Sequence, residues 1–362
     1  MRWLPIPIRE GDFVRGLAIL VIVLHNFLHR VPPSAGENEF FFDPVHFDRL
    51  LLALRSSPAE GLHLLFAALG FLPVHVFVFL SGYGLVRRYA DRAAPGWGRF
   101  MLRRLGRIYP AFAMAAALHL GLCWLRAGSF PASELGRLGL RLSLLSNFVP
   151  GSQLMPVGPW WFFSVIVQLY ALFPLLLRLG HLRPWALLAL GLFCAPAAVW
   201  LGALGTGFNP MFTALGYLPA FSLGMLAARC EPFRLPLTWL GPLLGLVVLG
   251  QALEALWMPG LLAACLALLI LFRGLRGRGE PGPLRRWIAR LGAMSLPAFA
   301  VHAVIRPEFV ALAGWAGHFA ATLGLAAAFA LASFGLAWLM DRLDFRVQRL
   351  SRGSAPPRDA GA

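Results

Sequence analysis

Two histidines and an arginine near the N-terminus have the types and spacing for acid–base chemistry inside an apolar helix. The run 14–29 starts beside Arg15 and ends with His25, Asn26 and His29. His25 follows Arg15 by ten residues, about 15 Å along a helix axis. Arg15 would therefore lie at one boundary of an apolar layer while His25 reaches its interior. Because histidine accepts and returns a proton near neutral pH, His25 is the leading candidate for a general base.

His25 and His29 are four residues apart, so they share one face of the predicted helix. The alternative for both is an interfacial histidine whose ring hydrogen-bonds to neighbouring backbone. No serine or cysteine nucleophile with a base beside it can be recognised in the sequence.

Three arginines lie at the start of the third apolar run. Arg103, Arg104 and Arg107 occupy positions i, i+1 and i+4. Such a cluster can bind the phosphates of a soluble ligand through bidentate contacts. The alternative is anchoring to anionic lipid headgroups, which the high density of arginine by itself favours.

Further polar side chains occur inside other apolar runs, where such groups are rare unless they serve a site. Those expected to line a polar cavity are Ser81, Tyr83, Trp161, Gln168, Tyr170 and His302. Trp161 and its neighbour Trp160 also fit an aromatic belt at a membrane boundary. His119 is more often a helix-packing residue than a ligand.

The elements that must position these residues are membrane-spanning helices. Of the 362 residues, 59% are hydrophobic and 13% charged, whereas soluble domains carry about 25% charged residues. A span needs about 20 mostly apolar residues. Ten such runs recur, at 14–29, 68–86, 109–127, 160–177, 185–204, 211–228, 235–252, 255–272, 291–305 and 310–340. The sequence therefore predicts one all-α integral membrane domain over 1–350, with ten helices around a polar cavity, and a disordered tail at 351–362.

Arginine placement predicts the orientation of these spans. The chain has a net charge of +16 and contains no lysine, and an excess of this size also occurs in nucleic-acid-binding proteins. With both termini placed inside, the inner segments hold 25 arginines and 8 acidic residues, and the outer segments 7 arginines and 8 acidic residues. Arginines collect in cytoplasmic loops, so we expect cytoplasmic termini, a lipid bilayer as partner and no nucleic acid.

The four cysteines are scattered singly, with neither disulfide-framework nor metal-ligand spacing. We expect them to be small packing residues, and we expect no metal site.

Five segments, in this order, resemble the motifs of the membrane acyltransferase-3 family, whose members acylate bacterial surface polysaccharides and related acceptors. They are RGLAILVIVLHN (15–26), VFVFLSGYGL (76–85), RRLGRIYP (103–110), WFFSVIVQLYALFP (161–174) and LGAMSLPAFAVHAVI (291–305). The resemblance covers residues 13 to about 340.

The resemblance implies roles for several of these residues. His25 would be the catalytic histidine and Arg15 its partner in the first span, with Asn26 and His29 beside them. Arg104 and Arg107, with Arg103 adjacent, would face the phosphates or pantetheine arm of an acyl-coenzyme A donor, most simply acetyl-coenzyme A. The acceptor would be a hydroxyl of a surface or lipid-linked carbohydrate, and the chain would lie in the bacterial inner membrane.

Two departures from the family pattern affect these roles. The usual arginine-to-histidine spacing is one residue longer, and position 26 is Asn, so His29 is an alternative to His25. The family's glutamate in the fourth span is absent: Ile166 stands in its place, with Gln168 nearby. Glu37 or Asp43 would replace this carboxylate if the outer loop GENEFFFD folds back into the cavity. Glu39 is expected on the same acceptor side.

Two other functions remain open from the sequence. The first is a non-catalytic carrier or flippase for a lipid-linked saccharide, with the histidines along its path. The second is a structural partner within a polysaccharide synthase complex. Neither would consume acetyl-coenzyme A.

Overall fold

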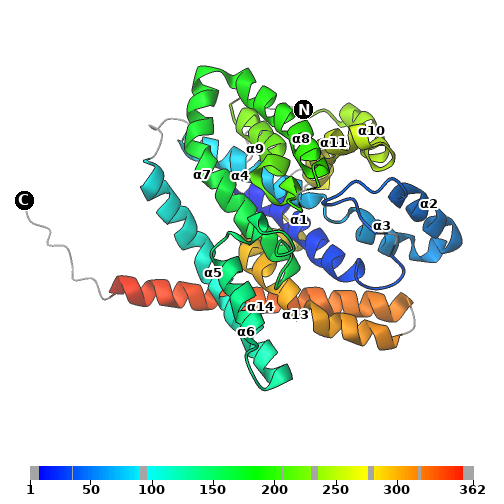
Figure 1. Cartoon of the computed structure of the whole chain (residues 1–362), viewed down its shortest axis with the longest axis vertical. Coiled ribbons are helices and arrows are strands. Elements are labelled where there is room, and N and C mark those ends of the chain that lie inside the picture. The colour runs from blue at the N-terminus through cyan, green and yellow to red at the C-terminus, as the bar shows by residue number, and fades with distance from the viewer. Residues whose placement is uncertain are drawn as a thin grey trace, which may run out of the picture.

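The computed structural model describes residues 8–34, 36–89, 96–205, 207–229, 235–275, 281–316 and 319–353. Within them the chain forms helices and no strand, so the predicted all-α class is confirmed (Figure 1). The helices are α1 (Ile8–Leu28), α2 (His46–Ser56), α3 (Gly61–Leu69), α4 (Pro73–Tyr89), α5 (Trp97–Ala127), α6 (Ala132–Leu142), α7 (Trp161–Leu182), α8 (Pro184–Ala203), α9 (Ala214–Ala227), α10 (Leu240–Ala252), α11 (Glu254–Leu275), α12 (Pro283–Ala293), α13 (Ser295–Ala316) and α14 (Phe319–Gly353).

Among the described residues, seven helices are long and apolar enough to cross a membrane. The pair Pro58–Leu69 and Pro73–Tyr89, bent by 44°, adds an eighth span if it is counted as one. Two shorter apolar helices, Ala214–Ala227 and Leu237–Ala252, coincide with the sixth and seventh predicted spans. The chain is therefore a multi-pass membrane protein, while the number of ten stays a prediction.

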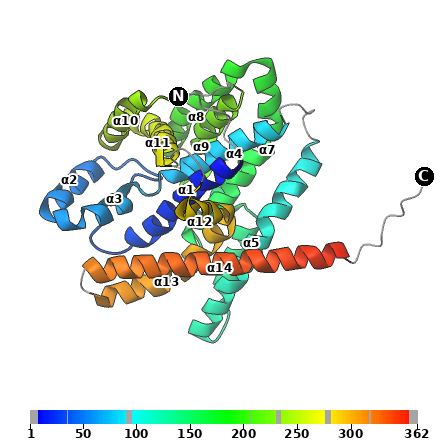
Figure 2. The ribbon, with the colours of Figure 1, turned by 180° about the vertical axis from the view of Figure 1, so that it is seen from behind.

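Helix α1 runs through the middle of the bundle (Figure 1). Arg15, His25 and Asn26 lie on it. The helix packs against α12, α13, α3, α4, α14 and α11. Figure 2 shows α14 running alongside α13 and on past α5. Because α1 is surrounded by other helices, its polar residues His25 and Asn26 are buried, whereas Asp12 and Arg15 are partly exposed.

Two predicted boundaries are wrong. The third span begins at Trp97 instead of 109, so the arginine cluster lies within α5. The loop predicted at 306–309 is helical, because α13 continues to Ala316. Helix α14 ends at Gly353; the rest of the tail predicted at 351–362 lies outside the described part of the chain, and that tail stays a prediction.

Candidate active site

Two cavities lie at successive levels along α1. The larger, of 460 Å³, surrounds the Arg15 end and is called the arginine cavity. The smaller, of 60 Å³, surrounds the His25 end and is called the histidine pocket. The polar side chains of the arginine cavity are Asp12, Arg15, Ser81, Arg88, Arg104, Arg107, Tyr170 and Ser295. Those of the histidine pocket are His25, Asn26, His29, Arg30, Glu37, Glu39, Trp161 and Arg306.

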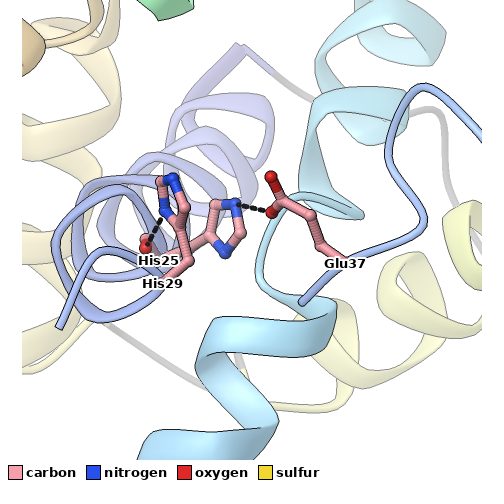
Figure 3. A group of neighbouring side chains, drawn as sticks. All are labelled: His25, His29 and Glu37. Atoms are coloured by element: carbon pink, nitrogen blue, oxygen red, sulfur yellow. Dashed lines mark hydrogen bonds and ion pairs between the residues drawn. The ribbon is translucent and has the colours of Figure 1, made fainter. Parts of the chain in front are cut away.

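The buried ring of His25 is held through both of its nitrogens. Nδ1 lies 3.0 Å from the carbonyl oxygen of Phe66 in α3. Nε2 lies 3.1 Å from Oε2 of Glu37 (Figure 3). A carbonyl oxygen can only accept, so Nδ1 donates, and the neutral ring carries its lone pair at Nε2. The nitrogen able to take up a proton therefore points into the histidine pocket.

Glu37 belongs to the loop between α1 and α2, which folds back onto the end of α1. A carboxylate and an imidazole lone pair both accept hydrogen bonds, so their contact requires one shared proton. Burial acts to raise the pKa of Glu37. The hydrogen bond and charge of His25, with the charges of His29 and Arg30, outweigh burial and hold this pKa below its ordinary value. Glu37 thus supplies a carboxylate at the candidate base, one of the two replacements considered from the sequence.

His29 lies one helical turn beyond His25 and contacts both its ring and its backbone. Its ring stacks on that of His25, with centroids 4.7 Å apart. Its Nδ1 lies 2.8 Å from the backbone oxygen of His25 (Figure 3). Because Glu37 contacts His25, the geometry favours His25 over His29 as the reacting histidine.

Arg306, which sequence analysis placed in an outer loop, lines the histidine pocket from within α13. Its Nη1 donates to Oδ1 of Asn26 at 3.1 Å. The Nδ2 of Asn26 in turn donates to the carbonyl oxygen of Ile22 at 3.0 Å. Asn26 thereby orients a guanidinium group in the pocket. Sequence analysis ended the ninth span at 305 and so left Arg306 outside it, whereas α13 continues through Pro307 to Ala316.

The arginine cavity contains most of the predicted phosphate-binding residues. Nη1 of Arg15 pairs with Oδ1 of Asp12 at 2.7 Å, a partner that sequence analysis did not single out. The Arg104 guanidinium lies over the rings of Phe100 and Tyr170, 5.2 and 5.3 Å from their centroids. Stacking of this kind holds arginine while leaving its N–H groups available for a ligand.

Arg103 does not join Arg104 and Arg107 in the arginine cavity. It is exposed, and its Nε donates to the carbonyl oxygen of Arg99 at 3.2 Å. One residue corresponds to about 100° around a helix, so Arg103 points away from a cavity that its neighbour faces. Arg103 therefore lies outside the cavity lining, and its role in donor binding stays a prediction.

Of the predicted cavity residues, Ser81 and Tyr170 line the arginine cavity and Trp161 lines the histidine pocket. Tyr83, Gln168 and His302 lie outside both linings.

These three residues have packing or capping contacts instead. Tyr83 stacks on Phe79 with centroids 6.4 Å apart. Oε1 of Gln168 accepts from the backbone N–H of Ala214, at the start of α9. The buried His302 has its Nδ1 3.1 Å from the carbonyl oxygen of Ala298.

Ile166, which stands in place of the family's glutamate, lines the arginine cavity. Asp43, the other replacement considered, pairs with Arg49 and lies outside the lining of the histidine pocket. Glu39 lines that pocket, and burial together with the charge of Glu37 raises its pKa well above the ordinary value. Burial therefore favours the neutral, protonated form of Glu39 over its carboxylate.

In the described part of the chain, two groups bring three metal-ligand atoms within 4.8 Å of one another: His25, His29 and Glu37, and His119, Cys123 and Glu134. Arg30 and Arg306 line the pocket of the first group and oppose a divalent cation. In the second group, Nε2 of His119 already hydrogen-bonds to Oε1 of Glu134 at 2.8 Å. Neither arrangement requires a metal, and the expectation of no metal site stays a prediction.

Comparison with known families assigns the chain. A family model described as an acyltransferase domain matches residues 9–342. The chain belongs to the acyltransferase-3 family. It is thus a membrane-embedded acyltransferase that takes an acyl donor and an acceptor. No curated protein and no solved structure matches it significantly. Within the acyltransferase, the matched residues include both cavities and every site residue named above.

Proposed function

We propose that this acyltransferase transfers an acyl group, most simply acetyl, from cytoplasmic acyl-coenzyme A to a carbohydrate hydroxyl in the bacterial inner membrane. The acceptor is a surface or lipid-linked saccharide. The observation that carries the proposal is the succession of an arginine-lined cavity and a histidine pocket along one helix, with Phe299 of α13 in both linings. Such an arrangement suits a phosphorylated donor on one side and a proton acceptor on the other.

The donor would bind in the arginine cavity. Arg15, Arg104 and Arg107 provide fixed positive charge for the phosphates of coenzyme A. The arginine cavity has a volume of 460 Å³, which falls within the usual range for a small-molecule site, about 300–1,000 Å³. The thioester would then point along α1 toward His25. The arginine excess of the segments placed inside supports entry of the donor from the cytoplasm, with both termini on that side.

His25 would act as the general base. In the resting site Nε2 shares a proton with the Glu37 carboxylate; when that proton is released to solvent and the carboxylate withdraws, the Nε2 lone pair is free. The acceptor hydroxyl takes the vacated position, and its oxygen attacks the thioester carbonyl carbon while Nε2 receives its proton. The carbonyl electron pair moves to oxygen, and Arg306 stabilises that charge. The C–S bond then breaks, and the departing thiolate takes the proton from His25. Direct transfer of this kind needs no covalent acyl-enzyme.

Replacement of His25 tests the proposal. His25→Ala should abolish acylation of surface polysaccharide, measured by mass spectrometry of polysaccharide from cells with the wild-type or variant chain. The variant must still reach the membrane, as an immunoblot of the membrane fraction would show. Undiminished acylation would contradict the assigned base. In membranes that contain the acceptor, the wild-type protein should also consume acetyl-coenzyme A, whereas a carrier or a structural partner would not.

A further inference from the structure

Phe299 is the residue at which the two cavities meet. It lies on α13 one turn beyond Leu296, which lines the arginine cavity, and seven residues before Arg306, which lines the histidine pocket. Phe299 itself belongs to both linings. A group passing from the donor site to His25 must therefore pass this ring.

The ring of Phe299 is held by its neighbours. Its centroid lies 5.1 Å from that of Phe162 and 5.8 Å from that of Phe163, the latter in edge-to-face geometry. Both neighbours come from α7 and also line the arginine cavity. Phe299 is only 7% exposed. A buried ring packed among aromatic side chains forms a well-defined wall.

The space beyond this wall is small. The histidine pocket has a volume of 60 Å³, and one water-sized group needs about 10–15 Å³. That space suits an acetyl group of three non-hydrogen atoms together with one acceptor hydroxyl. A butyryl group adds two methylenes, which would collide with the aromatic wall.

We infer that Phe299 sets the length of the acyl chain that the enzyme transfers. The inference rests on the proposed function, since it assumes a thioester donor in the arginine cavity. The Phe299 side chain limits the room beside His25, so a short acyl group reaches Nε2 and longer groups are rejected. Replacing the ring by a methyl group would merge the two cavities and admit longer chains.

A competition experiment tests this inference without knowledge of the acceptor. Membranes of cells carrying the protein are incubated with equal concentrations of acetyl- and butyryl-coenzyme A. Mild base then releases the transferred groups from the polysaccharide, and acetate and butyrate are quantified. Because both come from one sample, their ratio is independent of expression level. A single extra methylene is commonly discriminated by about 10- to 200-fold, so the wild type should favour acetate strongly.

Phe299→Ala should lower the acetate-to-butyrate ratio at least about tenfold, and Phe299→Leu should give an intermediate ratio if the alanine variant fails to fold. Phe309→Ala is the matched control, because Phe309 lies on the same helix, packs on Phe329 and lines neither cavity. An unchanged ratio in both Phe299 variants would overturn the inference. A wild-type chain that transfers neither group would instead overturn the proposed function.

Discussion

Glu37 and Glu39 line one pocket, yet the pKa values of their carboxyl groups are shifted in opposite directions. The hydrogen bond and charge of His25 outweigh burial and lower the pKa of Glu37, whereas burial and the charge of Glu37 raise the pKa of Glu39. Sequence analysis placed both residues on the acceptor side and did not distinguish these two environments. Glu37 is the one whose carboxylate contacts Nε2 of His25.

Glu37→Gln should lower kcat by about 10- to 100-fold, the value of a hydrogen bond to a charged group. The amide has no negative charge to pair with a protonated Nε2, and its N–H can occupy the Nε2 lone pair permanently. The matched control is Glu39→Gln, which should retain most activity because burial favours the neutral form of Glu39, and a glutamine imitates a neutral carboxyl group. Initial rates of coenzyme A release in membranes that contain the acceptor measure both. Equal losses in the two variants would contradict the distinction.

Arg306→Gln should lower kcat by about 100- to 1,000-fold while changing KM little, since the guanidinium is expected to act on charge that develops during the reaction. Arg306→Lys should recover part of the rate, because it keeps the charge and loses the planar geometry. The contrary result would be a raised KM at unchanged kcat, which would make Arg306 a binding residue only.

The double variant Arg104→Ala, Arg107→Ala should raise the apparent KM for acetyl-coenzyme A by at least about tenfold, since contacts between charged groups are lost. Arg103→Ala serves as its control, because Arg103 lies outside the cavity. Saturation curves with varied acetyl-coenzyme A distinguish the variants. A similar rise in KM for Arg103→Ala would indicate a general effect of surface charge.

At the scale of elements, close helix packing positions the site. A Cβ atom at Gly292 of α12 would overlap the carbonyl oxygen of Asp12 in α1, and one at Gly16 would overlap that of Ile288. The backbones of α1 and α12 therefore touch at the level of Arg15. Similarly, a Cβ at Gly70 would collide with the side chain of His25, so the bend between α3 and α4 lies directly on the candidate base.

Gly292→Ala should destabilise the protein by about 1–3 kcal/mol, the typical range for overpacking, because α1 and α12 must separate. Gly335→Ala is the control: it lies within α14, and nothing lies within 4 Å of the added methyl group. Alanine is the better helix former, so this second change should leave Tm unchanged or raise it. Thermal unfolding in detergent measures both. An equal Tm for the two variants would contradict the close packing.

Hydrophobic runs predicted that helices exist, but they did not predict where each helix ends. The start of α5 was not predicted, because its first turns are rich in arginine and precede the apolar run. The ninth apolar run ends at 305, whereas α13 continues through Pro307 to Ala316. Residues four apart, such as His25 and His29, could be placed on one face from spacing alone. The contact of Asn26 with Arg306 could not, because it joins residues 280 positions apart.

At the scale of the whole molecule, the proposed donor and acceptor sides require a defined orientation in the membrane. This orientation can be tested with single cysteines in a chain whose four natural cysteines are replaced. One cysteine replaces Ser133, in a segment predicted to lie outside, and the other replaces Gly96, in a segment predicted to lie inside. Both positions are exposed. In intact spheroplasts, a membrane-impermeant maleimide should label Ser133→Cys only. Labelling of Gly96→Cys instead would reverse the orientation and the proposed entry side of the donor.

The polar groups of the histidine pocket come almost entirely from one short stretch of chain. Except for Arg306 and Trp161, they lie between His25 and Glu39, and Phe66 adds the carbonyl that fixes the base. The arginine cavity, by contrast, draws on α1, α4, α5, α7, α12 and α13. If the two pockets serve acceptor and donor as proposed, the two preferences should separate on recombination. A chimera that exchanges residues 22–72 between two family members, and so leaves Arg15 in place, should inherit the acceptor choice of one parent and the donor choice of the other.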